Sequence, residues 1–464
     1  MAVSKPPLRL ITFLALLFLS SLVNAIPHDN KSTLTRRSVT LDLQRNPNYA
    51  PNGPAAYARA LTKWGAKVPA ELAASLDAMR GDVGVGDVGA ETIRDDREYL
   101  SRVGFGTPLQ WLSMDLDTGS ADVWIYSSET RQPVAGERRV WKIEESSTAE
   151  KVENGTWMIS YGDGSAAWGT LYRDTLSLAS LTLPNATLES AVSASSSLTS
   201  DPYIDGIFGL PYALPSQTDP QQPSVLSSLL PSLAAPLFTV DLRHHSSSGA
   251  YTFGYVDPSR HKSSTPIWYT PLTPNATFWQ FPYSGIHVGG NDTWYTSNST
   301  AIADTGTSLL LLGRHAAEVY YGTVPGASKN LTAGGIWTYP CTLSTLENGM
   351  LPDFEIGFEN GFVARVPGRF MNYTVMPDDT GKCMGGLQEW GNGEDLGIFG
   401  DVFLKAVYAV FDVGGGRIGF AEKELEGEGD DGDDEDGEDG EENGEEDGDD
   451  NDDGDDGEET DGSD

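Results

Sequence analysis

Along most of the chain, hydrophobic residues occur in short runs separated by glycine, proline and asparagine. This pattern extends from about residue 97 to residue 421, and the segments 157–161 and 409–412 are typical of it. Short runs rich in β-branched and aromatic residues, bounded by turn-forming residues, predict β-strands. With Gly 52 and Pro 27 in 464 residues, we expect a loop-rich, all-β (mainly β) protein.

The N-terminal region has a different pattern. An apolar run at 10–23 follows Lys5 and Arg9 and ends at a small residue, Ala25. This is typical of a signal peptide at 1–25, and the run is short for the alternative, a membrane anchor. Residues 55–79 have Ala, Leu and Trp at helical spacing. We interpret 26–95 as a removable pro-segment, with Arg36-Arg37 as a dibasic processing site.

Charge is concentrated at the other end. The net charge is −38, and residues 422–464 contain 27 acidic residues and one lysine, which leaves −12 for the rest of the chain. Such a tail cannot bury apolar surface, so we expect it to be disordered. Neither part has the clustered Lys and Arg that phosphate binding requires, so no nucleic-acid partner is expected. No membrane anchor is expected either.

Modification signals agree with a secretory route. Asn30 begins one Asn-x-Ser/Thr sequon, and glycosylation is predicted at seven others: Asn154, Asn185, Asn275, Asn291, Asn298, Asn330 and Asn372. Cys341 and Cys383 are the two cysteines. In an oxidising compartment we expect them to pair and close a 43-residue loop. Two free thiols are the alternative.

Two landmarks repeat in the same order along the chain. Asp117-Thr118-Gly119-Ser120 returns as Asp304-Thr305-Gly306-Thr307, and Gly-Ile-Phe-Gly occurs at 206–209 and again at 397–400. The spacing from the aspartate to the last glycine is 92 positions in the first copy and 96 in the second. The repeat predicts two lobes of similar topology, each contributing one Asp-Thr-Gly turn.

Paired carboxylates can hydrolyse a peptide bond. Asp117 and Asp304, if they share one proton, can both deprotonate a water molecule and protonate the substrate carbonyl, and such a dyad works at acid pH. Gly119 and Gly306 would allow close backbone approach. The hydroxyl groups of the adjoining Ser and Thr residues can orient the loops and the carboxylates; these residues are Thr118, Thr305, Ser120 and Thr307.

These motifs resemble those of pepsin-like aspartic proteases, in particular the fungal secreted pepsins. The resemblance covers about 96–421 in order, through the segments 105–108, 117–124, 161–165, 303–309 and 397–421. It implies a bilobal fold with a central substrate cleft, with lobes at 96–265 and 266–421. It also implies an endopeptidase made as a zymogen that hydrolyses polypeptides and binds pepstatin-type inhibitors.

The resemblance also assigns roles to individual residues. Asp117 and Asp304 are the dyad, Tyr161 is the flap tyrosine, and Trp124 is its hydrogen-bonding partner. The residues expected to contact substrate are Tyr161, Gly162, Asp163, Gly119, Gly306, Thr307, Ile204 and Ile207. Core packing remains open as the role of the two isoleucines. Cys341 and Cys383 match the disulfide of the C-terminal lobe. Residues 57–65 resemble fungal pro-peptides, with Lys63 as the first candidate to neutralise the dyad and Lys67 as the second.

Some features depart from the family pattern. Tyr126-Ser127-Ser128 stands where many relatives have a cysteine pair, so we expect the first lobe to rely on packing. The acidic tail has no counterpart, and its retention is open. A pepsin-fold binding protein that does not cut its partner is the alternative function. The enzyme is favoured because both aspartates, the adjacent glycines and the flap tyrosine are present.

Other chemistries are disfavoured. The chain has no His-Glu-x-x-His zinc motif and no Gly-x-Ser-x-Gly elbow. The glycines at 84–89 match a dinucleotide fingerprint, but no strand precedes them and no helix follows. We therefore predict no metal and no cofactor. We expect a monomer that is exported to the medium, with an acidic vacuole as the alternative destination.

Overall fold

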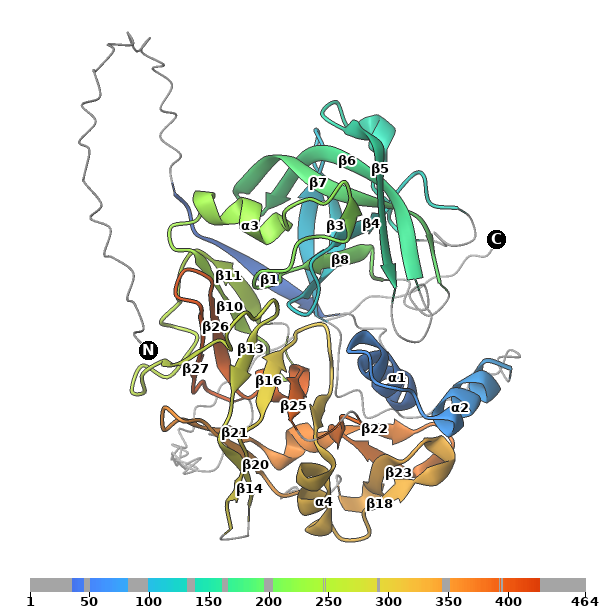
Figure 1. Ribbon diagram of the computed structural model, residues 1–464, viewed down its shortest axis with the longest axis vertical. Coiled ribbons are helices and arrows are strands. Elements are labelled where there is room, and N and C mark those ends of the chain that lie inside the picture. The colour runs from blue at the N-terminus through green and yellow to red at the C-terminus, as the bar shows by residue number, and fades with distance from the viewer. Residues whose placement is uncertain are drawn as a thin grey trace, which may run out of the picture.

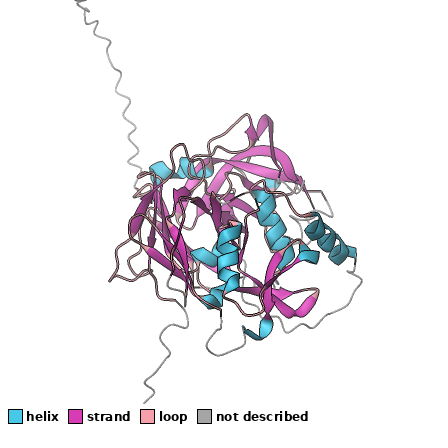
Figure 2. Ribbon diagram, turned by 60° about the horizontal axis from the view of Figure 1, so that its bottom comes forward, coloured by secondary structure: helices cyan, strands magenta, loops and turns pink. Residues whose placement is uncertain are grey.

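The computed structural model describes residues 36–45, 51–81, 99–131, 138–160, 166–195, 203–244, 246, 248–289, 293–343, 351–391, 393 and 395–425. The predicted signal peptide, the segment 161–165 and the acidic tail beyond 425 lie outside these residues. Figures 1 and 2 show that strands are the predominant regular secondary structure of the described chain, with few helices. The predicted mainly β class is confirmed.

The largest sheet has 14 strands and links the two halves of the chain. In spatial order its strands are β12 (Trp268–Pro271), β27 (Arg417–Ala421), β26 (Tyr408–Asp412), β10 (Leu237–Asp241), β11 (Ala250–Phe253), β1 (Val39–Arg45), β2 (Tyr99–Phe105), β3 (Gln110–Asp117), β8 (Gly206–Gly209), β4 (Val123–Tyr126), β7 (Leu181–Ala194), β6 (Ala166–Leu178), β5 (Glu150–Ser160) and β9 (Thr218–Asp219). An additional β2–β6 pairing closes six of these strands into a barrel.

Three smaller sheets form the C-terminal half, which occupies the lower part of Figure 1. The first contains β13 (Gln280–Pro282), β16 (Thr300–Ala303), β25 (Leu396–Phe399), β17 (Leu310–Leu312) and β24 (Leu387–Glu389). The second contains β15 (Tyr295–Thr296), β14 (Gly285–Val288), β20 (Phe354–Gly357) and β21 (Val363–Val366). The third contains β18 (Ser328–Asn330), β19 (Ile336–Pro340), β23 (Asp379–Gly385) and β22 (Asn372–Met376).

Helices are short. The α-helices are α1 (Gly53–Lys63), α2 (Ala70–Gly81), α3 (Val225–Leu229), α4 (Arg314–Gly322) and α5 (Asp401–Leu404), and the 3-10 helices are η1 (Ile143–Glu145), η2 (Leu230–Ser232), η3 (Leu331–Ala333), η4 (Cys341–Leu343) and η5 (Gly368–Met371). Among the described residues, none of them has both the length and the apolar character needed to cross a membrane.

The sequence repeat corresponds to a repeat in topology. In the first copy, β3 runs parallel to β8 and β4 runs antiparallel to it; in the second, β16 and β17 flank β25 in the same two senses. Each Asp-Thr-Gly turn therefore connects two strands that lie on either side of a Gly-Ile-Phe strand. Both turns therefore lie at equivalent positions in the two halves. The equivalent topology explains why the two landmarks recur in the same order along the chain.

The predicted helical stretch 55–79 is two helices rather than one. Asn52 caps the start of α1, because its Oδ1 accepts a hydrogen bond from the Ala55 amide at 3.0 Å. The helix ends at Lys63, and Gly65 follows with a φ of 73°. Pro69 disfavours helical backbone at the preceding residue, so α2 begins only at Ala70. The break allows α1 and α2 to contact different parts of the C-terminal half.

Strand β1 was not predicted. It lies in the interior of the large sheet, paired with β11 from Val39 to Asp42 and with β2 from Leu43 to Arg45. Its side chains alternate between buried and exposed from Val39 to Gln44, which is the period of a half-buried strand. The predicted pro-segment therefore contributes to the main sheet of the molecule.

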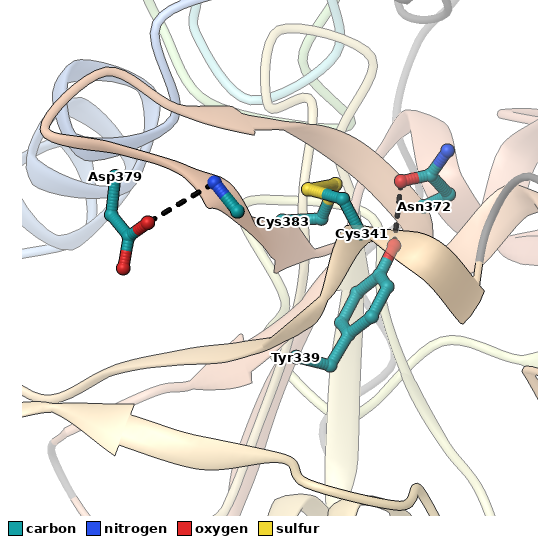
Figure 3. Close-up of a disulfide and its surroundings, with 6 residues drawn as sticks. Tyr339, Cys341, Asn372, Asp379 and Cys383 are labelled. Atoms are coloured by element: carbon teal, nitrogen blue, oxygen red, sulfur yellow. Dashed lines mark hydrogen bonds between the residues drawn. A yellow bond between two sulfur atoms is a disulfide. The ribbon is translucent and has the colours of Figure 1, made fainter.

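The cysteine pairing is confirmed. Cys341 and Cys383 form a disulfide that joins the end of β19 to β23, with Cα atoms 4.9 Å apart (Figure 3). Close by, the Tyr339 hydroxyl donates a hydrogen bond to Asn372 Oδ1 at 2.5 Å. The bridge and this hydrogen bond connect the strands of the third small sheet.

The first lobe contains a polar network that the sequence did not predict. Glu129 Oε1 accepts hydrogen bonds from the Lys151 ammonium (2.9 Å) and the Tyr172 hydroxyl (2.8 Å), while Oε2 accepts from Thr170 (2.5 Å) and Ser190 (3.1 Å). These residues come from four separate segments. The network connects them next to Tyr126-Ser127-Ser128, so packing is not the only stabilising interaction there.

This network predicts an acid-dependent contribution to stability. Partial burial favours a raised pKa, but the hydrogen bonds from Thr170, Lys151 and Tyr172 prevail and lower the pKa of Glu129 to about 2. The stabilisation is therefore present above about pH 4.3, where an unfolded Glu is ionised, and is lost as the pH falls through about 2.

We expect Glu129→Gln to reduce the free energy of unfolding by about 1 kcal/mol at pH 6. The difference from wild type should shrink toward pH 2. Urea unfolding of the precursor in an Asp117→Asn background, which prevents self-cleavage, would measure it. Glu145→Gln, in an exposed pair with Lys142, is the matched control and should change stability little. A deficit that is the same at pH 2 and pH 6 would contradict the assignment.

Candidate active site

The structure brings Asp117 and Asp304 together. Asp117 ends β3, Asp304 follows β16, and both are buried. The Lys63 ammonium donates to Asp117 Oδ1 at 2.7 Å and to Asp304 Oδ1 at 2.9 Å. Since one nitrogen atom contacts both, the two carboxylates from opposite halves of the chain are adjacent.

The two turns are connected by reciprocal hydrogen bonds. The Thr118 amide donates to Thr305 Oγ1 at 3.1 Å, and the Thr305 amide donates to Thr118 Oγ1 at 3.0 Å. Each hydroxyl also donates to the strand that precedes the opposite turn, Thr118 to the Ala303 carbonyl (2.9 Å) and Thr305 to the Leu116 carbonyl (2.6 Å). All of these groups are buried, so the threonines hold the turns in one geometry, as the sequence suggested.

The glycines allow the turns to approach each other. A Cβ atom on Gly119 would collide with the carboxylate of Asp304, and one on Gly306 would collide with that of Asp117. The glycine amides also orient the aspartates: Gly119 N donates to Asp117 Oδ1 at 2.8 Å and Gly306 N donates to Asp304 Oδ1 at 3.0 Å. Any larger residue at either position would separate the carboxylates.

The two outer hydroxyl groups differ. Thr307 Oγ1 donates to Asp304 Oδ2 at 2.5 Å. Ser120 lies close enough to Asp117 to help lower the pKa of that carboxyl, yet its buried Oγ makes no hydrogen bond of good geometry within the described part of the chain. The support predicted for both carboxylates is therefore stronger around Asp304.

Burial and Lys63 act in opposite directions on the dyad. Burial raises the pKa of each carboxyl, and the adjacent ammonium lowers it; the net pKa is below the ordinary value for Asp117 and above it for Asp304. Burial lowers the pKa of Lys63, but the attraction of both carboxylates outweighs it and holds this pKa above the ordinary value. Lys63 is therefore charged while the pair is enclosed.

Trp64 is a contact that sequence reasoning missed. Its Nε1 donates to Asp304 Oδ2 at 3.0 Å, and its ring packs edge-on against Phe278 with centroids 4.9 Å apart. Trp64 follows the residue that ends α1, so its position depends on where the helix stops. Lys67, the second candidate for neutralising the dyad, is exposed, and it has no ion pair among the residues described.

Asp115 is a second residue of the site that was not predicted from the sequence. It is half-buried on β3, two residues before Asp117, so both side chains project from the same face of the strand. Burial and the neighbouring Asp117 raise the pKa of Asp115 to about 7. The two-residue period of a β-strand could have predicted this. An acidic residue at position 115 lies on the same face of β3 as Asp117, and therefore beside the dyad.

The predicted flap falls in the segment 161–165, outside the described residues. Tyr161, Gly162 and Asp163 lie beyond the described residues, between β5 and β6. Trp124 is buried, stacks on Trp157 with centroids 6.1 Å apart, and has an Nε1 without a hydrogen-bond partner in the described segments. The pairing of Trp124 with Tyr161 stays a prediction.

The two isoleucines occupy different environments. Ile207 lies on β8 opposite Asp115 and packs on the cluster that contains Trp124. Ile204 is half-buried, and its carbonyl accepts a hydrogen bond from Arg138 at 3.2 Å. Of the two, Ile207 is the one whose strand register places it beside the dyad.

The predicted glycosylation sites fall into two groups. Asn154, Asn185 and Asn275 are exposed with φ between 55° and 60°, which is typical of turns, and Asn298 is also exposed. The side chains of Asn330 and Asn372 are half-buried and accept hydrogen bonds, from η3 amides and from Tyr339 respectively. Asn291 lies outside the described chain.

Comparison with known proteins identifies the family. The model of the family "Eukaryotic aspartyl protease" matches residues 98–423. Aspartic protease pepA of Arthroderma gypseum is 36% identical over 88% of this chain and 97% of its own length. Endothiapepsin of Cryphonectria parasitica is 34% identical over 86% and 93%, and penicillopepsin-3 of Penicillium janthinellum is 35% identical over 88% and 98%. The chain therefore belongs to the eukaryotic aspartyl protease family and is an aspartic endopeptidase.

Proposed function

We propose that Asp117 and Asp304 are the catalytic dyad of this protease and that the protein is made as a zymogen in which Lys63 blocks them. The observation that carries the proposal is the single ammonium that contacts Oδ1 of both carboxylates. A position equidistant from two such oxygens is where a nucleophilic water molecule would bind once Lys63 leaves.

The proposed reaction uses one shared proton. The ionised carboxylate accepts a proton from water as the water oxygen bonds to the peptide carbon, and the protonated carboxyl gives its proton to the carbonyl oxygen. The resulting diol then collapses: the C–N bond breaks, the departing nitrogen takes a proton from one carboxyl, and a hydroxyl proton returns to the dyad. The amides of Gly119 and Gly306 keep both carboxylates oriented throughout.

Acid releases the proposed block. The attraction between Lys63 and Asp117 is present above about pH 4, where an unfolded Asp is ionised. It is lost as the pH falls through the lowered pKa of Asp117, because protonation removes the negative charge that holds the ammonium. The precursor should therefore be inert near neutral pH and open in acid.

Replacing either aspartate tests the dyad. We expect Asp117→Asn and Asp304→Asn, each made as a separately processed enzyme, to lose about 10²–10⁴-fold in kcat/KM, since the amide can neither accept nor donate the transferred proton. Hydrolysis of denatured globin at acid pH, with and without pepstatin, is the measurement. Asp395→Asn, an exposed control, should retain wild-type activity.

The same assay examines the alternative of a binding protein. Correctly processed wild-type protein that leaves globin intact at every pH between 2 and 6 would favour a pepsin-fold binding module over the enzyme. Activity in both asparagine variants equal to that of wild type would place the catalytic groups elsewhere.

Removing the ammonium tests the zymogen. We expect Lys63→Ala to lower the free energy of unfolding of the precursor by about 3 kcal/mol at pH 7, because two buried carboxylates lose their counter-charge, and to shift acquisition of activity to higher pH. Urea unfolding and the pH of half-maximal conversion are the measurements. Lys67→Ala should match wild type in both. A Lys63→Ala precursor as stable and as inert as wild type would rule out the block.

The activating cut is proposed to lie at 82–98. Cleavage after Arg37 would leave β1, α1 and Lys63 attached, and the Arg37 backbone is bonded on both sides, from its amide to the Ser232 carbonyl (3.0 Å) and from the Ala234 amide to its carbonyl (2.9 Å). The segment 82–98 joins α2 to β2. We expect N-terminal sequencing of the active form to begin between residues 83 and 99, and a start before α1 would contradict this.

The remaining proposals concern location and substrate. We propose that 1–25 directs secretion, that the exposed sequons carry glycans, and that the active form is a monomer. Polypeptides are the substrates, with apolar side chains preferred beside the scissile bond.

A further inference from the structure

The helices of the proposed pro-segment pack on an apolar cluster of their own. It contains the buried side chains of Tyr57, Leu61 and Leu72 together with ten buried residues that all lie between 302 and 398. We call six of these ten the pro-segment face: Ala333, Ile336, Tyr373, Met376, Met384 and Trp390. The cluster is separate from the main core, which contains buried residues of both halves.

The contacts on this face are close. A Cβ atom on Gly53 would collide with Met384 Sδ, and Gly334, which has a φ of 74°, lies directly against Leu72. The Tyr57 hydroxyl donates to the Glu389 carbonyl at 2.9 Å. Helix α1 therefore lies beside β22 (Figure 1) and contacts Met384 of β23 and the residues after β24, and α2 lies on η3.

The face and the dyad are separate parts of the contact. Lys63 and Trp64 reach the carboxylates, whereas Gly53 lies ten residues earlier on α1, about 15 Å away along the helix axis. Acid acts on the carboxylates but does not weaken apolar packing or a hydrogen bond to a backbone carbonyl. Once the pro-segment is removed, the apolar face therefore remains on the protease at the pH at which it works.

We propose that the pro-segment face serves in the mature protease as an exosite that binds an amphipathic helical segment of a polypeptide substrate. This inference rests on the proposed function, since it assigns a second contact to the same hydrolysis. The chemistry of the ligand follows from the current occupant: apolar side chains on one side, as at Leu61 and Leu72, and exposed polar ones on the other, as at Arg59 and Glu71.

The exosite discriminates between substrates by length. A peptide of about six residues, centred on the dyad, extends about 10 Å to either side and does not reach Met384, which lies against Gly53 at the far end of α1. A long polypeptide can occupy both sites at once, which raises the effective concentration of its scissile bond. Long substrates that carry an amphipathic segment should therefore be preferred over short ones.

A competitor peptide tests this without altering the enzyme. The probe is a synthetic peptide of residues 51–78 with Lys63→Ala and Trp64→Ala, which removes its contacts to the dyad and keeps those to the face. The control peptide adds Leu61→Asp and Leu72→Asp. Processed enzyme is assayed at acid pH on denatured globin and on a chromogenic hexapeptide, while mass spectrometry monitors the probe for cleavage.

We expect the probe to slow globin hydrolysis by at least about 3-fold at a concentration that changes hexapeptide hydrolysis by less than about 1.3-fold, and the control peptide to have no effect. Equal inhibition of both substrates would place the probe at the dyad and overturn the exosite. Inhibition of neither would overturn it as well.

A variant provides an independent measurement. Ile336→Ser in the processed enzyme should lower kcat/KM for globin by about 3-fold or more and leave that for the hexapeptide unchanged; an equal loss for both would contradict a separate site. Pepstatin-sensitive hexapeptide hydrolysis in wild type distinguishes the two proposals. Its presence supports the dyad whatever the probe does, and its absence contradicts the proposed function and this inference together.

Discussion

The structure depends on holding two acidic side chains from opposite halves of the chain next to each other in a buried place. Two like charges there would repel each other and favour separation of the lobes. The reciprocal bonds between Thr118 and Thr305 oppose this, because each threonine is anchored to the strand that carries the opposite aspartate. Glycines complete the arrangement by leaving no side chain between the carboxylates.

In the full-length chain the repulsion between the two carboxylates is also opposed by a second set of contacts. Lys63 supplies a positive charge between the carboxylates, and Trp64 satisfies an oxygen atom that Lys63 does not contact. An indole can only donate a hydrogen bond, so it accompanies an ionised carboxylate without competing for its proton. Charge compensation at the dyad and apolar packing on the C-terminal half thus hold the same segment by two independent means.

Much of the fold and the centre of the site could be predicted from the sequence. The two Asp-Thr-Gly turns, the Gly-Ile-Phe-Gly strands and the cysteines can each be recognised from residue types within a short segment of sequence. Other features depend on distant partners. Strand β1 is a short alternating run whose neighbours lie about 60 and 200 residues away in the sequence, and the Glu129 network collects side chains from segments that only the fold brings together. Neither can be read from one stretch of chain.

Gly65 and Pro69 could have predicted the break between α1 and α2. The helical spacing of the apolar residues at 55–79 does not show it. The position of Trp64 depends on that break, because Trp64 is the residue that directly follows the end of α1. Asp115 could have been found from the strand period. The flap residues at 161–163 remain a prediction from resemblance.

The interior position of β1 makes the proposed removal of the pro-segment difficult to reverse. Its backbone is paired on both sides, with β2 and with β11, so its departure opens the sheet and leaves two edges whose amide and carbonyl groups need new partners. Returning it would require threading a free peptide back between edges that have since found other partners or closed on each other. If the proposed maturation removes β1, it is therefore a one-way step, and a return to neutral conditions would not restore the starting molecule.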